Sequence, residues 1–172
     1  NVLGYLDLSP FGEKYQDSAN AGNLDLIAAL EWIRDNIEGF GGDPENVTLF
    51  GQSGGGVKVW SLLQMPEADG LFHKGIIESG VVDPDLLGDI EDGNGREIVK
   101  AMLAELGLEE KDVDQLETLP YDQLAQAYEK AAPKVAQKGE YVGNHPHKNQ
   151  SYFGDAIKHG FREETKKIPL ST

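Results

Sequence analysis

A serine between glycines is the feature of this sequence best suited to chemistry. Residues 51–55 read Gly-Gln-Ser-Gly-Gly and fit the pattern G-x-S-x-G, which places a serine in a sharp turn between a strand and a helix. Such a turn exposes the hydroxyl and aims the following backbone N–H groups at the point where a carbonyl oxygen becomes negative during acyl transfer. We therefore predict Ser53 as a nucleophile, with Gly54 and Gly55 as oxyanion donors.

The pattern is short, so its surroundings decide between two interpretations. In the simpler one, Ser53 only caps a helix within a glycine-rich turn. The neighbouring residues favour a nucleophile, because residues 47–50 (Val-Thr-Leu-Phe) form a β-prone run of the kind buried in parallel sheets. A helix is predicted from about residue 54 to residue 64. Strand, serine turn and helix therefore follow one another in the order that the chemistry requires.

Other elements near this turn predict a parallel sheet. Four apolar residues recur at steps of four, three and four, which indicates one face of a helix over residues 24–37. These residues are Leu26, Leu30, Ile33 and Ile37. A second strand is expected at residues 75–79. Because strand, helix and strand at this spacing form a βαβ unit, we predict the α/β class with a parallel sheet of few strands and flanking helices.

The second half of the sequence is mainly helical. Apolar residues recur there at helical spacing in three stretches, and a last β-prone run follows. These stretches lie at residues 99–106, 113–116, 124–131 and 168–170. We predict one domain, in which residues 1–80 form a core around the serine turn. Residues 81–172 then form an acidic helical excursion and a return strand of the same domain.

Composition excludes several classes of protein. The chain has 172 residues, with 15 Lys+Arg against 30 Asp+Glu and a net charge of −15, so it would repel nucleic-acid phosphate. Without Cys, it has no disulfide, thiolate metal site or cysteine nucleophile. No apolar run approaches the length of a membrane span, so we expect a soluble protein with no membrane partner. The first residues do not read as a signal peptide, and the compartment stays open between bacterial cytoplasm and secretion.

Longer stretches on both sides of the serine resemble one family, the type B carboxylesterases, which includes bacterial para-nitrobenzyl esterases and cholinesterases. The matching stretches follow the order of the family through residues 1–80, and looser matches continue beyond. They include Ala-Gly-Asn-Leu-Asp at 21–25, Phe-Gly-Gly-Asp-Pro at 40–44, residues 47–56, Leu-Leu-Gln-Met-Pro at 62–66 and Tyr-Phe-Gly-Asp at 152–155. The resemblance implies a partial α/β-hydrolase fold and hydrolysis of small esters with short acyl groups, without a metal or organic cofactor.

The resemblance also implies roles for individual residues. Ser53 matches the nucleophile of the family, which forms an acyl-serine intermediate, and the Gly54 N–H matches an oxyanion donor. Gln52 stands where relatives often carry Glu. Ser79 matches a serine that supports the catalytic histidine without contacting the substrate.

Three parts of the family's machinery have no match in this chain, which resembles a truncated, internal part of a longer member. The glycine-rich oxyanion loop of the family precedes the position of Asn1. The acid and the histidine of its triad follow the position of Thr172. Because a serine hydroxyl without a base is a poor nucleophile, we expect this chain to be a weak enzyme unless another residue serves as base.

His147 is the residue that we predict as a recruited base, with Asp155 as a candidate acid partner. His145 and His147 fall where bacterial relatives approach the mouth of the active site. The simpler interpretation, two exposed histidines in a proline-containing loop, stays open. We expect His73 to be structural and His159 to lie at the opposite end of the sheet. The two loop histidines lack a third ligand at a suitable spacing, so no metal site is predicted.

Two classes of function remain for the chain. It is either a serine esterase or a non-catalytic hydrolase-like module for binding, and the intact turn around Ser53 favours the esterase. A sheet of few strands leaves strand edges unpaired, and unpaired edges invite pairing with another chain. We therefore also predict a homo-oligomer that forms by exchange of segments.

Overall fold

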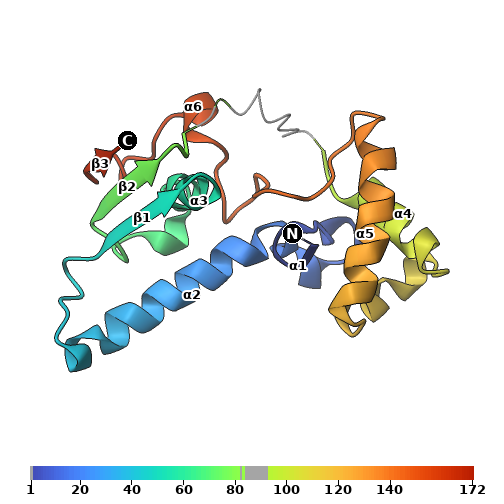
Figure 1. Cartoon of the computed structure of the whole chain (residues 1–172), viewed down its shortest axis with the longest axis horizontal. Helices are drawn as coiled ribbons and strands as arrows, with labels where there is room; N and C mark the ends of the chain where they lie inside the picture. The colour runs from blue at the N-terminus through green and yellow to red at the C-terminus, as the bar shows by residue number, and fades with distance from the viewer. Residues whose placement is uncertain (1, 82, 84–92) are drawn as a thin grey trace. The chain divides into compact units, whose positions relative to one another are not determined.

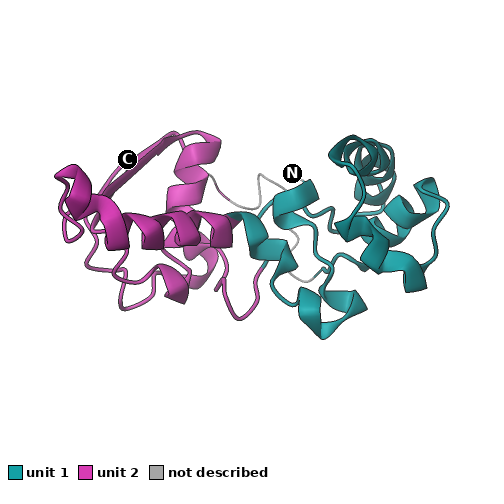
Figure 2. Ribbon diagram, turned by 90° about the horizontal axis from the view of Figure 1, so that it is seen from below, with its two compact units in different colours: residues 1–22, 90–147 teal, residues 23–89, 148–172 magenta. Residues whose placement is uncertain are grey.

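The computed structural model describes residues 2–81, 83 and 93–172, and it divides into two compact units. Unit 1 comprises Asn1–Gly22 and Ile90–His147, and unit 2 comprises Asn23–Asp89 and Lys148–Thr172 (Figure 2). Each unit has a hydrophobic core of its own.

Both units combine segments from the two halves of the sequence. That residues 1–80 and 81–172 belong to one domain stays a prediction. Most of the acidic run that follows residue 83 lies outside the described residues.

Unit 2 contains a parallel sheet of three strands in the order β1-β2-β3. The strands are β1 (Thr48–Gln52), β2 (Lys74–Glu78) and β3 (Leu170–Ser171) (Figure 1). Helix α3 (Gly54–Leu62) connects β1 to β2, so the predicted βαβ unit is confirmed. The pairing runs from Thr48 beside Lys74 to Gln52 beside Glu78.

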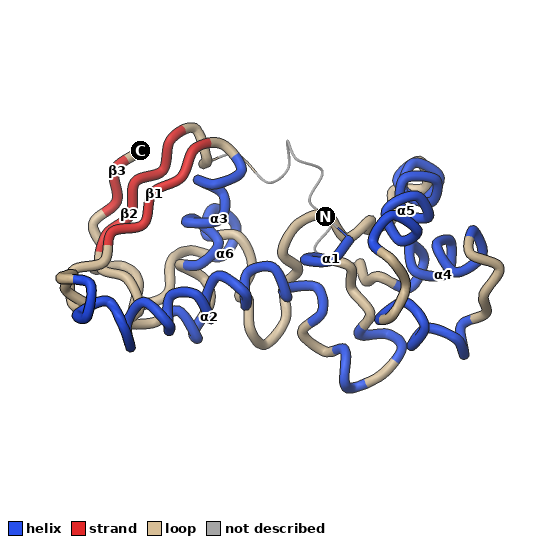
Figure 3. The backbone as a smooth tube through the Cα atoms, turned by 60° about the horizontal axis from the view of Figure 1, so that its bottom comes forward, coloured by secondary structure: helices blue, strands red, loops and turns tan. Residues whose placement is uncertain are grey.

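The helices of unit 2 lie on one side of this sheet (Figure 3). They are α2 (Ala21–Asn36, whose first two residues belong to unit 1), α3, the short α6 (Ala156–His159) and the 3-10 turns Ile37–Phe40 and Pro66–Ala68. Their apolar side chains form the core of the unit: Ile27, Leu30, Leu62, Leu63, Met65, Ala68, Leu71, Phe72 and Tyr152. On the other face of the sheet, Phe50 is 79% exposed and Ile76 is 39% exposed.

Helix α2 buries a slightly different face from the one that the spacing of its apolar residues predicts. Leu30 is buried as expected, but Leu26 is 37% exposed and its neighbour Ile27 takes the buried position. Successive residues of a helix point about 100° apart, so a modest rotation exchanges the two. The helix ends at Asn36, and the 3-10 turn Ile37–Phe40 behind it is followed by Gly41, whose φ of 83° favours glycine.

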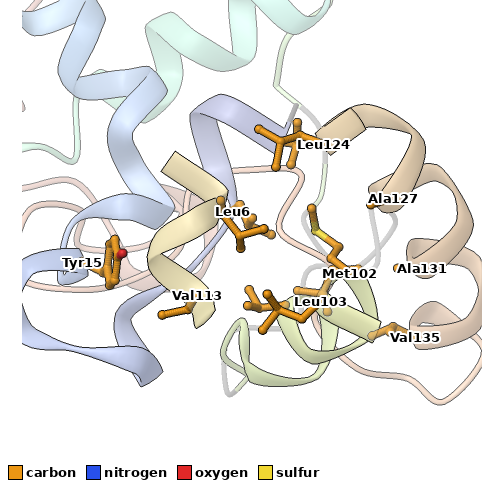
Figure 4. Close-up of a cluster of buried hydrophobic side chains, with 13 residues drawn as sticks. Leu6, Tyr15, Met102, Leu103, Val113, Leu124, Ala127, Ala131 and Val135 are labelled. Atoms are coloured by element: carbon orange, nitrogen blue, oxygen red, sulfur yellow. The ribbon is translucent and has the colours of Figure 1, made fainter. Parts of the chain in front are cut away.

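Unit 1 is helical, as the second half of the sequence predicted. Its main elements are α4 (Arg96–Glu105), the 3-10 helix η7 (Glu110–Glu117) and α5 (Tyr121–Ala136). The start of the chain adds α1 (Val2–Tyr5) and three 3-10 turns, Ser9–Phe11, Glu13–Tyr15 and Ser18–Asn20. Side chains from α1, α4, η7, α5 and the first two of these turns meet in one core, in which Met102, Leu103, Leu124 and Ala131 face one another (Figure 4).

Within the described residues, none of the helices is both long enough and apolar enough to cross a membrane. The same residues contain no cluster of three or more His, Cys, Asp or Glu side chains that could hold a metal ion.

Candidate active site

Ser53 occupies a strained turn between β1 and α3. Its φ of 50° and ψ of −117° lie outside the regions that non-glycine residues favour. The Ser53 N–H donates to the Glu78 carbonyl oxygen at 2.8 Å and so continues the pairing of β1 with β2. Its carbonyl oxygen accepts from the Val57 N–H at 3.0 Å, the first bond of the helix. The side chain is exposed, so the turn lifts its hydroxyl out of the sheet.

Glycines make this turn possible because three backbone segments pass very close to one another. A Cβ on Gly51 would lie 2.3 Å from the Gly55 carbonyl carbon. A Cβ on Gly80 would lie 2.5 Å from the Cα of Gly56. Real Cβ atoms do not come this close to backbone, so only glycine fits at both positions. The first turn of α3 can therefore rest directly on the ends of β1 and β2.

The space beside the serine is open. A Cβ on Gly54 or on Gly55 would have no heavy atom within 4 Å. Both N–H groups belong to the first turn of α3, where backbone donors have no partner within the helix and carry partial positive charge. A substrate carbonyl could thus approach Ser53 with its oxygen toward these two donors.

The strand register brings Gln52 and Ser79 to the same place. Gln52 ends β1 and is paired with Glu78, the last residue of β2, so Ser53 and Ser79 follow directly after paired residues. Both serines have positive φ values, 50° and 53°. The structure therefore gathers the predicted residues of this region at the carboxyl ends of the parallel strands, where ligands bind in open α/β sheets.

His147 lies in unit 1, where its backbone and ring are both held. The Asn20 side-chain amide donates to the His147 carbonyl oxygen at 2.8 Å, and its oxygen accepts from the His147 N–H at 3.0 Å. The Tyr141 ring centroid is 4.6 Å from that of His147 and 5.6 Å from that of His145. Because Ser53 belongs to unit 2, pairing of His147 with Ser53 stays a prediction.

The other candidate residues have structural partners. His73 Nδ1 accepts from the Val47 N–H at 3.1 Å, just before β1 and β2 begin. His159 ends α6, and its Nδ1 lies 3.5 Å from Lys148 Nζ. Asp155 caps α6 by accepting from the Ile157 N–H at 2.7 Å, and its second oxygen accepts from the indole N–H of Trp60 at 3.0 Å.

Sequence reasoning missed Asn20 and Lys58. Asn20 is fully buried, and its carboxamide holds the backbone of a residue 127 positions away. No local pattern marks such a contact. Lys58 is partly buried on α3, and burial lowers the pKa of its amine. The position of this lysine within the apolar stretch Val-Lys-Val-Trp at residues 57–60 could have indicated that it is partly buried.

Comparisons with known proteins agree with this geometry. The model of the carboxylesterase family matches residues 1–171. The para-nitrobenzyl esterase of Bacillus subtilis is 42% identical over 136 residues, which are 79% of this chain and 26% of that protein. Carboxylesterase 5A of Felis catus is 61% identical over 80 residues, which are 46% of this chain and 14% of that protein.

Solved structures give the same result for the whole chain. An esterase from Clostridium hathewayi, described as able to hydrolyse aliphatic aromatic polyesters, matches 99% of this chain and 34% of its own with a TM-score of 0.94 and 55% identity. A thermophilic PNB esterase matches 99% of this chain and 34% of its own with a TM-score of 0.77 and 35% identity. The predicted partial α/β-hydrolase fold is thereby confirmed, and the chain spans about a third of the length of these structures. It belongs to the carboxylesterase family.

Proposed function

We propose that the chain carries the nucleophile of a carboxylic-ester hydrolase, which forms an acyl-serine on Ser53. The observation that carries this proposal is the backbone of that residue. It is strained at φ 50° and exposed, and the close approach of Gly51 to Gly55 on either side of it leaves no room for a side chain on Gly51. Strain of this kind costs about 1–3 kcal/mol, and such residues cluster at active sites.

The proposed reaction has two steps. The Ser53 hydroxyl adds to the ester carbonyl carbon and loses its proton to a base, while the N–H groups of Gly54 and Gly55 bind the oxyanion. The alcohol leaves with a proton, and water then releases the acid from the acyl-serine. Gln52 and Ser79 frame the site, and we propose Ser79 as support for the catalytic histidine.

We propose His147 as the base available within this chain. Two hydrogen bonds from Asn20 hold its backbone, and its ring packs beside that of Tyr141. These contacts restrict the orientation of the imidazole. A serine hydrolase stripped of triad members retains on the order of 10³–10⁴-fold acceleration over water. The isolated chain should therefore be a slow esterase.

Fluorophosphonate labelling and steady hydrolysis of p-nitrophenyl butyrate test the proposal. The wild-type chain should be labelled at Ser53 and turn over slowly, whereas Ser53→Ala should lose both the label and the turnover. His147→Gln should keep the fold and reduce the rate. Equal turnover by wild type and Ser53→Ala, with no label at Ser53, would support the non-catalytic alternative.

A polymer is a second candidate substrate, favoured by the 55% identity to the Clostridium hathewayi esterase. We propose that the chain also acts on ester bonds between aliphatic and aromatic units of polyesters. Release of aromatic acid from a film of poly(butylene adipate-co-terephthalate), compared between the wild-type chain and its Ser53→Ala variant, tests it. No release beyond that of the variant would limit the substrates to small esters.

We also propose that the isolated chain forms homo-oligomers by exchange of segments. Among the described residues, no further strand pairs with the outer edges of β1 and β3, and Phe50 and Ile76 on one face of the sheet are exposed. Sedimentation velocity at micromolar concentration should show dimers or larger species. A single monomer peak over this range would contradict the proposal.

A further inference from the structure

A pocket of about 340 Å³ in unit 2 is lined by basic and aromatic side chains, and we call it the basic pocket. Gln64, which lines it, follows the end of α3, whereas Ser53 precedes the start of that helix, so the pocket and the nucleophile lie at opposite ends of α3. Among the described residues that line it, Lys148, His159 and Arg162 are basic and none is acidic. This is unusual in a chain with twice as many acidic as basic residues.

Arg162 supplies a buried cation to this pocket, since its side chain is only 9% exposed. The two carboxylate oxygens of Asp69 accept from its Nη1 and Nη2 groups, and Glu164 Oε2 lies 3.6 Å from Nη2. A guanidinium has five N–H donors, and the other three have no hydrogen-bond partner within the described part of the chain. Arg162 can therefore keep its bonds to Asp69 and still donate to a ligand.

Lys148 adds a second cation, which is exposed. Its Nζ lies 3.5 Å from His159 Nδ1, and it forms no ion pair with any carboxylate of the described residues. The charge of Arg162 is offset by its acidic neighbours, whereas that of Lys148 is not. The basic pocket should therefore attract a small anion.

Two phenyl rings complete the lining of the basic pocket. Phe153 is 43% exposed and its ring centroid lies 5.5 Å from Arg162 Cζ, whereas Phe161 is half-buried. The Gln64 Nε2 group donates to the carbonyl oxygens of Gly154 and Gly160, both at 3.0 Å, and so holds the segment that carries these rings. The pocket therefore combines anion-binding donors with an aromatic surface of fixed shape.

We propose that the basic pocket is a binding site for a small aromatic carboxylate. The carboxylate accepts hydrogen bonds from Arg162 and Lys148, and the ring of the ligand packs against Phe153 and Phe161. An aliphatic acid lacks the ring contact, and a neutral aromatic alcohol lacks the charge. Because the pocket lies at the other end of α3 from Ser53, this inference does not rest on the proposed role of that serine.

Titration of the full, isotope-labelled chain with benzoate at low ionic strength, followed by NMR, tests the proposal. Backbone amide signals of Asn149, Gly160 and Arg162 should shift saturably. The dissociation constant should be about fivefold lower for benzoate than for acetate or benzyl alcohol, since each of these lacks one of the two contacts. Equal affinity for benzoate and either control, or shifts confined to the residues around Ser53, would overturn the proposal.

Exposed side chains allow variants that leave the fold of unit 2 intact. Lys148→Gln should weaken benzoate binding about two- to fivefold, as expected for the loss of an exposed charge pair. Lys167→Gln is the matched control, because Lys167 is also exposed in unit 2 but does not line the pocket, and it should bind benzoate as the wild type does. Phe153→Leu should reduce the preference for benzoate over acetate. Equal weakening by the two lysine variants would show a general effect of charge and contradict the site.

Discussion

The backbones of Gly51 and Gly55 lie so close together that no side chain fits between them. A Cβ on Gly51 would lie 2.3 Å from the Gly55 carbonyl carbon and 2.4 Å from its carbonyl oxygen. This contact seats the first turn of α3 on the end of β1. Ser53, which joins the two elements, is left outside the contact with its hydroxyl exposed.

Gly51→Ala should therefore destabilise unit 2. The added methyl group meets backbone, which cannot move aside as a flexible side chain could, so we expect a loss of about 3 kcal/mol in the free energy of unfolding. Urea unfolding followed by tryptophan fluorescence measures it, because both tryptophans, Trp32 and Trp60, lie in unit 2. Gly39→Ala is the matched control, since a Cβ there meets no atom within 4 Å. Equal stability of the two variants would contradict the close contact.

Replacing the nucleophile should reveal the strain of its turn. Ser53→Gly should unfold with a free energy about 1 kcal/mol higher than Ser53→Ala, because glycine adopts a positive φ without penalty. At Ser61, in the last turn of the same helix, the order should reverse, since alanine is the better helix former. The same urea titrations give both comparisons. If alanine were the more stable replacement at both positions, residue 53 would not be strained.

One cluster of side chains in unit 1 should contribute to a loss of stability at both extremes of pH. The Tyr15 hydroxyl donates to Asp114 and Glu117, and Lys14 forms ion pairs with both at 3.0 and 2.9 Å. The hydrogen bond from Tyr15 contributes most, followed by that from Lys14. Together they lower the pKa of Asp114 below its usual 3.8 and that of Glu117 below its usual 4.5. Burial and the two carboxylates raise the pKa of Tyr15 to about 12.

The signs of these shifts set the two pH windows. Carboxyl groups with lowered pKa values stabilise the folded state above pH 4.5, and this contribution is lost as the pH falls through the folded values. The raised pKa of Tyr15 stabilises below pH 10, and this contribution is lost as the pH rises from 10 to about 12. Thermal unfolding followed by helical circular dichroism should show both declines, and Tyr15→Phe should reduce the alkaline one, to which the raised pKa of the half-buried Tyr128 also contributes. An unchanged alkaline decline in Tyr15→Phe would exclude this tyrosine as its source.

Asn20 should determine how firmly the segment around His147 is held. Asn20→Ala removes two partly buried hydrogen bonds that hold the His147 N–H and carbonyl, which costs about 1–3 kcal/mol. The His147 amide should then exchange its hydrogen faster in native-state exchange measurements. Asn20→Asp should destabilise unit 1 more than the loss of one hydrogen bond would. A carboxylate oxygen then faces the His147 carbonyl oxygen in place of the N–H donor. Unchanged exchange in both variants would show that the segment is held elsewhere.

Much of the nucleophile turn could be predicted because its causes are local. The run at residues 47–50, the glycines around Ser53 and the apolar helix behind it specify a strand, a bend and a helix from adjacent residues. The parallel pairing followed from the same spacing, since a strand, helix and strand of these lengths can return only as a parallel pair.

The buried face of α2 could not be predicted with the same success. Leu26 and Ile27 are neighbours of similar hydrophobicity, and periodicity alone cannot choose between them. The choice depends on which side chains of α3 and of the following segment the helix meets. Ile27 packs with Leu62 and Leu63 in that core, while Leu26 lines an apolar hollow of about 310 Å³ together with residues of β1 and α3.

By itself, the sequence determined that residue 53 is a serine in a strand-to-helix bend and that the chain resembles carboxylesterases. Only the tertiary structure decided that Asn20 forms hydrogen bonds with the backbone of His147 and that Asp155 accepts one from Trp60. It also decided that Lys58 lines an apolar hollow. The first two contacts join residues 127 and 95 positions apart, and the hollow is built from three separate elements. Contacts of that range arise from the packing of whole elements, whereas the bend at Ser53 is imposed by its immediate neighbours.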